Sequence, residues 1–252
     1  PEAWRLIGED PRDDVRAPQF AQLVRAFMPD VLDLQEYSLH MHQRFYPLIR
    51  RYGYRIAYEG EEPWNNTPIF YNPETVELVD VNYVLYAPSC WSNIGSKSYT
   101  SAVFRKKDTG RLFAVVNTHL WWKSEAAQPG STYARAAQVR LMMAEAEVLK
   151  NKYGCTIFVT GDMNAYEDSL PIRQFIEGGY TPCYKAATDA TDNGNGHHIC
   201  GPKDGYSRTS RRRSPDREKG AIDHCFIYNA QEGVAVKVFD CITARFTVKL
   251  TD

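Results

Sequence analysis

Four short apolar runs in this chain each end in acidic, amide or imidazole side chains. The runs have the length and the β-branched or aromatic content of buried strands. Strands of this kind form the core of a sheet, so the polar groups beside them, although far apart in the sequence, can meet at one rim. The four polar segments are Leu34-Gln35-Glu36, Asn117-Thr118-His119, Gly161-Asp162-Met163-Asn164 and Ile222-Asp223-His224.

The size and the charge of the chain restrict its class. Its 252 residues, of which 43% are hydrophobic and 24% charged, fit one large domain with a sizeable core. The formal net charge of −1 cannot draw a polyanion from a distance, so recognition of phosphate has to be local. No apolar stretch approaches the roughly 20 residues that cross a bilayer. We therefore expect a monomer without a membrane span, and the sequence leaves its compartment open.

The cysteines show no CxxC spacing. A chain of this length can keep thiols as small core hydrophobes, which is the favoured interpretation. The alternative is a disulfide between loop cysteines such as Cys183 and Cys200, if the protein is exported. The six cysteines are Cys90, Cys155, Cys183, Cys200, Cys225 and Cys241.

Periodicity and turn signals predict interleaved helices and strands without strict βαβ alternation, which favours mixed sheets over a parallel barrel or a Rossmann arrangement. Helices are predicted over 18–27, over 38–52, from a cap at Ser131 or Thr132 to 153, and from a cap at Asp168 or Ser169 to 177. Strands are predicted up to 36, up to 160 and in four successive segments, over 69–71, 76–84, 101–105 and 112–118, that pair most simply as a meander. After a polar loop over 188–220, three closing strands follow, the last over 243–250.

These residue types suit hydrolysis of a phosphate ester, which needs a cation, a group that orients and deprotonates water, and donors for the developing charge. Glu36 can supply a hard oxygen ligand to Mg²⁺, for which one or two carboxylates suffice; a surface salt bridge is the alternative. If 160–164 stays extended, Asp162 and Asn164 lie on one side, where Asp162 can position water and Asn164 can donate to phosphate. The alternative for this pair is an ordinary turn.

Two further positions fit the same chemistry. His119 can stabilise or protonate a phosphoryl oxygen if a carboxylate holds its other nitrogen, although a lone Asn-Thr-His at a strand end is often structural. Asp223 can orient a catalytic histidine, or else bond to backbone. His224 is expected on the opposite face, because neighbours in a strand alternate.

In this order, each beside a predicted strand, the segments resemble the endonuclease/exonuclease/phosphatase family, also called DNase I-like. The resemblance implies an α/β fold, a four-layer α/β/β/α sandwich of two mixed, mostly antiparallel sheets, with an Mg²⁺-dependent site that can also take Mn²⁺. By motif, Glu36 and Asp252 are metal ligands, and His119, Asp162, Asn164 and Asp223 are catalytic. The marks are PDVLDLQE (29–36), TPIFYN (67–72), NTHLWW (117–122), GDMNA (161–165) and AIDHCFI (221–227).

The sequence departs from the family pattern at three places. The family usually closes on Ser/Thr-Asp-His, and its final histidine would follow Asp252. The opening strand with its metal-binding Asn is not found before Pro18, so we expect a single domain over 1–252 that is shortened at both ends. Asn65 stands where many relatives carry the Glu that orients the strand-end histidine, here His119.

The expected substrate is a phosphate monoester or diester, within a nucleic acid, a nucleotide, or a sugar or lipid phosphate. Asn117, Trp122 and Arg135 are the candidate substrate-binding residues. Trp122 can stack on a planar group, and Arg135 can reach a phosphate from the start of its helix, although packing and a solvated helix face are the alternatives. A catalytically silent binding module on the same fold is the competing hypothesis.

Overall fold

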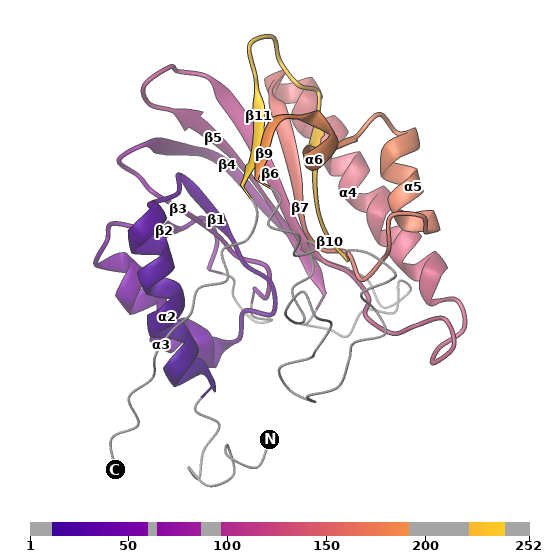
Figure 1. Cartoon of the computed structure of the whole chain (residues 1–252), viewed down its shortest axis with the longest axis horizontal. Coiled ribbons are helices and arrows are strands. Elements are labelled where there is room, and N and C mark those ends of the chain that lie inside the picture. The colour runs from indigo at the N-terminus through magenta and orange to yellow at the C-terminus, as the bar shows by residue number, and fades with distance from the viewer. Residues whose placement is uncertain (1–11, 60–64, 87–96, 192–221, 240–252) are drawn as a thin grey trace, which may run out of the picture.

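Two sheets packed face to face, each covered by helices on its outer side, form four layers (Figure 1). The computed structural model describes residues 12–59, 65–86, 97–191 and 222–239. The smaller sheet has the antiparallel order β1-β3-β2, with β1 over Val31–Asp33, β3 over Ile69–Tyr71 and β2 over Arg55–Ile56. Helices α2 (Arg12–Phe27) and α3 (Leu39–Arg50) cover it.

The larger sheet holds six strands in the order β4-β5-β6-β7-β10-β8, and only β6 and β7 run parallel within it. Helices α4 (Ser131–Tyr153) and α5 (Leu170–Glu177) cover its outer face. The predicted α/β/β/α sandwich of mixed, mostly antiparallel sheets is therefore confirmed. The strands are β4 (Val76–Leu85), β5 (Ser98–Lys106), β6 (Leu112–His119), β7 (Thr156–Asp162), β10 (Asp223–Tyr228) and β8 (Thr181–Pro182). The short helix α6 (Cys183–Ala186) and a parallel pair of β9 (Ala187–Thr191) and β11 (Val236–Phe239) complete the described elements.

Each of the three spaces between layers has its own apolar core, and strand alternation sorts residues between them. Along β6, Val115 faces the smaller sheet, whereas Ala114 and Val116 face α4. By the same period of two, Asn117 and His119 share the face of Val115 and point between the sheets. The packing therefore turns the polar end of β6 toward the smaller sheet.

Several predicted boundaries are wrong. The strand Ile69–Tyr71 does not join the meander, because it pairs with β1 and β2 in the smaller sheet. Helix α2 begins before Pro18, with Asp13 and Asp14 in a first turn that favours acidic residues. The cap of α4 is Gly130, at a φ of 89°, and not Ser131 or Thr132; the Glu125 carboxylate accepts from the backbone of Gly130 and Thr132 instead.

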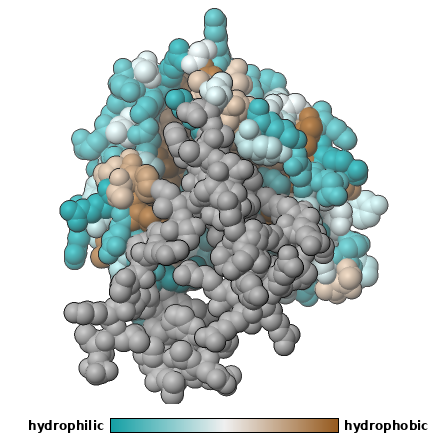
Figure 2. Space-filling model, viewed as in Figure 1, coloured by the Kyte–Doolittle hydropathy of each residue, from teal (hydrophilic) through white to brown (hydrophobic). Residues whose placement is uncertain are grey.

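The predicted polar loop over 188–220 begins as strand β9, and its remainder lies outside the described residues, as does the predicted strand over 243–250. Within the parts that the structure describes, no helix is long and apolar enough to span a membrane. Figure 2 shows mainly hydrophilic residues on the visible described surface, with hydrophobic residues in small separate patches.

Candidate active site

Three of the predicted catalytic residues stand in one row across the larger sheet. His119 at the end of β6 is in register with Asp162 at the end of β7, and Asp162 is in register with Asp223 at the start of β10. Residues opposite one another in neighbouring strands place their side chains on the same face. This site row therefore presents an imidazole and two carboxylates side by side at one end of the sheet.

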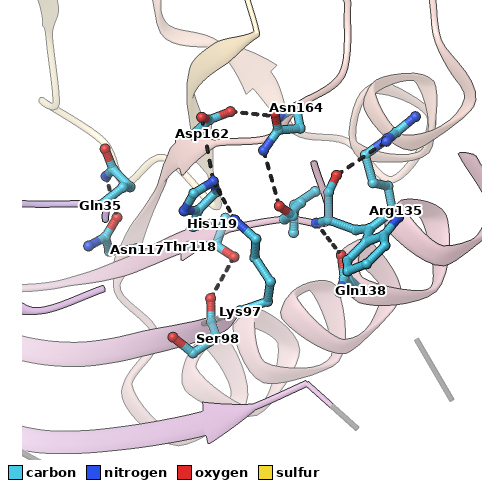
Figure 3. Close-up of polar contacts among 12 residues, drawn as sticks. Gln35, Lys97, Ser98, Asn117, Thr118, His119, Arg135, Gln138, Asp162 and Asn164 are labelled. Atoms are coloured by element: carbon cyan, nitrogen blue, oxygen red, sulfur yellow. Dashed lines mark hydrogen bonds and ion pairs between the residues drawn. The ribbon is translucent and has the colours of Figure 1, made fainter. Parts of the chain in front are cut away.

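The next row inward ties the two sheets together. The Asn117 amide is fully buried; its Nδ2 donates to the carbonyl oxygens of Leu34 (2.8 Å) and Pro68 (3.1 Å), and its Oδ1 accepts from Gln35 (2.7 Å). Both the oxygen and the nitrogen of the Asn117 amide thus form hydrogen bonds between the layers. Figure 3 shows the one from Gln35. Asn117 thus holds the smaller sheet against β6, and its contact with substrate stays a prediction.

A second contact between the sheets joins Asp33 to Thr160, whose Oγ1 donates to Asp33 Oδ2 at 2.7 Å. Burial raises the pKa of Asp33 to about 6, against the lowering effect of that hydrogen bond. The other oxygen, Oδ1, is buried and finds no hydrogen-bond partner in the described parts of the chain. Such an orphaned acceptor favours the protonated carboxyl and acts in the same direction as burial.

Glu36 enters the site from the smaller sheet. It follows β1, lies exposed, and has a φ of 55°, which is uncommon for a residue other than glycine. Strained backbone of this kind clusters at functional sites. The charges of Glu36 and Asp162 both act on Lys97, which places the two carboxylates around a common cation.

Lys97 is the buried cation of the site. Its Nζ lies 2.6 Å from His119 Nε2, and His119 Nε2 lies 3.6 Å from Asp162 Oδ2 (Figure 3). Burial lowers the pKa of Lys97 to about 8, although the charges of Asp162 and Glu36 oppose the change. Burial and the Lys97 charge together lower the pKa of His119 to about 3. The ring is therefore neutral at pH 7, which disfavours the imidazolium that would protonate a phosphoryl oxygen.

Asp162 and Asn164 meet through a turn. Asn164 has a φ of 47°, so the chain does not stay extended past β7, and of the two alternatives for this pair the turn is the one that forms. Asp162 Oδ1 accepts from the Asn164 backbone nitrogen at 2.8 Å, and Asn164 Nδ2 donates to the Leu120 carbonyl oxygen at 3.1 Å. The turn holds Asn164 beside Asp162 and ties both to the segment that follows His119.

Gly161 allows β6 and β7 to approach closely at the site row. It has a φ of 140°, and a Cβ there would overlap the Thr118 carbonyl oxygen. Only glycine combines this conformation with this approach. The distance between His119 and Asp162 thus depends on the absence of a side chain at position 161.

Buried side chains hold the loop after β6 in place. Arg135 of α4 is buried, and its Nη1 donates to the carbonyl oxygens of Trp121 (3.2 Å) and Lys123 (2.7 Å), so it anchors the loop (Figure 3). Its contact with a phosphate stays a prediction. The Trp121 indole is buried and donates to Ser131 Oγ. Trp122 is 60% exposed, and the Lys123 ammonium lies 5.7 Å from the centre of its ring.

One of the three departures from the family pattern has a structural counterpart. Asn65 is buried and bonds to Thr67, Thr100 and the Tyr58 carbonyl oxygen, so its amide supports β5. The carboxylate that accompanies His119 comes instead from Asp162. Asp252, the second expected metal ligand, lies outside the described residues.

A model of the Endonuclease/Exonuclease/phosphatase family matches residues 8–251. The chain belongs to this family. No curated protein matches it in sequence. Among solved structures of the same fold, the Bacteroides thetaiotaomicron mannosyl-6-phosphatase is 19% identical with a TM-score of 0.70, covering 94% of this chain and 84% of that one. An endonuclease/exonuclease/phosphatase from Bacteroides vulgatus is 21% identical (TM-score 0.66, covering 91% and 85%), and the human nocturnin catalytic domain with bound sulfate is 20% identical (0.60, 85% and 74%).

The resemblance to this family implies a divalent cation. Whether such an ion fits depends on the metal-ligating side chains of the site. Among residues 12–59, 65–86, 97–191 and 222–239, no group of three or more His, Cys, Asp or Glu has the arrangement of a metal cage. Mg²⁺ does not need such a cage, because it keeps several waters and takes only one or two carboxylates. The exposed Glu36, at its strained position, fits that requirement.

Lys97 is the site residue that sequence reasoning missed. The predicted strand 101–105 starts too late, because β5 opens with Ser98, Thr100 and Ser101, polar residues that are nevertheless buried. A strand beginning at 98 pairs Tyr99 with Thr118 and so brings Lys97 next to His119. The hairpin signal at Asp108-Thr109-Gly110, extended by antiparallel register, could have found this lysine.

Proposed function

We propose that this protein hydrolyses a phosphate monoester or diester by metal-assisted in-line attack of water. The observation that carries the proposal is the site row, His119–Asp162–Asp223, with Lys97 buried against it. Phosphoryl transfer asks little covalent chemistry of a protein and much positioning and charge stabilisation. A desolvated ammonium beside two carboxylates is suited to that task.

In the proposed mechanism Lys97 stabilises the charge that develops on the phosphoryl oxygens. The Nε2 of neutral His119 accepts a hydrogen bond from the Lys97 ammonium, so the ring proton resides on Nδ1. In this mechanism His119 orients the Lys97 ammonium and does not donate a proton itself. Asp162 orients the attacking water and takes its proton, and the Asn164 amide beside it binds a phosphoryl oxygen. We assign Asp223 the orienting of a further histidine.

Glu36 would hold the cation, Mg²⁺ or Mn²⁺, with Asp252 as the second ligand. When bound, such an ion neutralises phosphoryl oxygens and acts as a Lewis acid. The charge of Glu36 supports this role, since it acts on Lys97 together with the charge of Asp162.

For the substrate we propose an ester whose leaving group carries a ring. Trp122 is exposed directly after the site row on a loop that Arg135 holds in place, and an indole face attracts a base or another planar group. The likeness in fold to a mannosyl-6-phosphatase makes sugar phosphates a further class to test. The net charge of −1 disfavours tight binding of long duplex DNA.

The test is activity on a panel of phosphate monoesters and diesters with Mg²⁺, with EDTA as the blank. Asp162→Ala should lose at least about 10²-fold in kcat/KM, the size expected for a base or a charge-stabilising group. Asp108→Ala is the matched control, because Asp108 is an exposed carboxylate in the turn between β5 and β6. Full-length protein inert on every ester, and indistinguishable from Asp162→Ala, would leave the silent binding module as the function.

A further inference from the structure

Two cysteines outside the proposed chemistry lie in contact at the edge of the larger sheet. Cys183 Sγ is 3.1 Å from Cys225 Sγ, although the residues are 42 positions apart in the sequence. Cys183 begins α6, and Cys225 lies on β10 two residues after Asp223. We propose that Cys183 and Cys225 are a modification site, a dithiol that closes reversibly to an intramolecular disulfide.

Strand register supports this pairing independently of the sulfur contact. β10 pairs antiparallel with β8 through Phe226 opposite Pro182 and Ile227 opposite Thr181. Continuing that register by one residue puts Cys225 opposite Cys183. Opposed residues in an antiparallel pair have Cα atoms about 4.5–5.5 Å apart, within the range of about 4.4–6.8 Å that a disulfide spans. The separation expected from the register is therefore compatible with a disulfide.

The environment distinguishes the two thiols. The hydrogen bond from Cys225 lowers the pKa of Cys183, whereas that same contact and the charge of Asp33 raise the pKa of Cys225. Cys183 is thus the thiol that ionises first. Cys225 is exposed and gives a small reagent access to the pair, while Cys155 is buried in the core beneath α4.

The oxidant that this chemistry requires is a small-molecule disulfide, RS–SR. The Cys183 thiolate attacks one of its sulfurs, which forms a mixed disulfide and releases one RS⁻. Cys225 then loses its proton to solvent and attacks Cys183 Sγ, which releases the second RS⁻. Two protein thiols are oxidised and lose two electrons, and one RS–SR is reduced to two thiols.

The test treats the whole protein with oxidised glutathione, blocks remaining thiols with iodoacetamide and maps the peptides without reduction. Trypsin separates the three relevant cysteines into peptides 174–185 (Cys183), 186–203 (Cys200) and 220–237 (Cys225). We expect a linked pair of 174–185 with 220–237, which dithiothreitol separates. A link of 174–185 to 186–203, or free thiols at both positions after prolonged oxidation, would overturn the proposal.

Variants make the outcome specific. Cys225→Ser should stop at one glutathione adduct on peptide 174–185, because no second thiol remains to displace it. Oxidation should raise the Tm of the wild type, since a cross-link over 42 positions restricts the unfolded chain. Cys155→Ala should keep that rise, and Cys183→Ser should lose it. An equal rise in Cys183→Ser would also contradict the pairing.

Discussion

The Lys97 ammonium nitrogen lies 2.6 Å from His119 Nε2, and both side chains are almost completely buried. Burial lowers the pKa of Lys97 to about 8, so its ammonium loses a proton at a lower pH than that of an exposed lysine.

Replacing Lys97 should therefore remove charge stabilisation from the proposed reaction. We expect Lys97→Met to lower kcat/KM by about 10²–10³-fold, the size of the loss of one stabilising donor. The wild-type pH profile of kcat/KM should fall above about pH 8 as the ammonium loses its proton. Lys97→Arg should abolish that alkaline fall, because arginine stays protonated. An unchanged alkaline limb in Lys97→Arg would assign the titration to another group.

The lowered pKa of His119 gives a stability prediction. The ring binds a proton near its usual pKa of 6.5 in the unfolded chain but only at about 3 in the folded one. The free energy of unfolding should therefore fall as the pH drops from about 6.5 toward 3, by about 1 kcal/mol per pH unit from this residue. Urea unfolding of wild type and His119→Gln between pH 7 and pH 4 measures the difference. Equal pH slopes for both proteins would contradict it.

Asp33 should act in the opposite direction. Its carboxyl keeps a proton up to a pKa of about 6 in the folded protein, against 3.8 in the unfolded chain. The wild type should lose about 1 kcal/mol per pH unit through this residue as the pH rises from about 4 to 6. Asp33→Asn should lack that loss, so its stability relative to wild type should improve across this window and stay level above it. A constant difference at all pH values would show that Asp33 titrates normally.

A side chain at Gly161 should push β6 and β7 apart. Gly161→Ala combines a strained φ with overlap on the Thr118 carbonyl oxygen, and we expect a loss of about 2–4 kcal/mol in the free energy of unfolding. Gly110→Ala is the control, because Gly110 also has a positive φ of 71° but has open space where the Cβ would stand. Its cost should be about 1 kcal/mol. Similar losses for the two variants would mean that the close approach of the strands adds nothing.

Trp122 should set the preference among substrates. Trp122→Ala should raise KM about tenfold or more for esters whose leaving group is a ring, with kcat retained, because stacking on an aromatic side chain is worth about 1–3 kcal/mol. Small acyclic phosphate esters should be unaffected. Phe27→Ala controls for loss of an exposed aromatic residue, since Phe27 is 59% exposed at the end of α2 in another layer. Equal effects on cyclic and acyclic esters would contradict the stacking role.

The sequence was sufficient to predict a site residue where its position depends only on the strand that carries it. The polar ends of β6 and β7 and the start of β10 were predicted, because apolar runs with β-branched residues mark buried strands whatever their partners. Sheet membership was not predictable in the same way. Ile69–Tyr71 precedes β4 directly yet pairs with β1 and β2, since pairing depends on packing between distant segments.

Buried polar contacts in the site could not be predicted from the sequence. Asn117 and Arg135 have the chemistry of substrate ligands, but their partners are backbone carbonyl oxygens, which no side-chain pattern reveals. Lys97 was not predicted because Ser98, Thr100 and Ser101 at the start of β5 are polar residues typical of a loop, although they are buried. The turn at Asn164 was weighed against an extended segment, and local sequence alone could not decide between them.

The Gln35–Asn117 hydrogen bond joins the layer of the smaller sheet to the larger sheet, and the Asn117 amide also donates to the Leu34 carbonyl oxygen. Glu36 follows a strand of the smaller sheet, and Asp162 ends a strand of the larger one. A ligand that separates the two layers at Asn117 would therefore move the two carboxylates apart, and would disable the proposed site without occupying it.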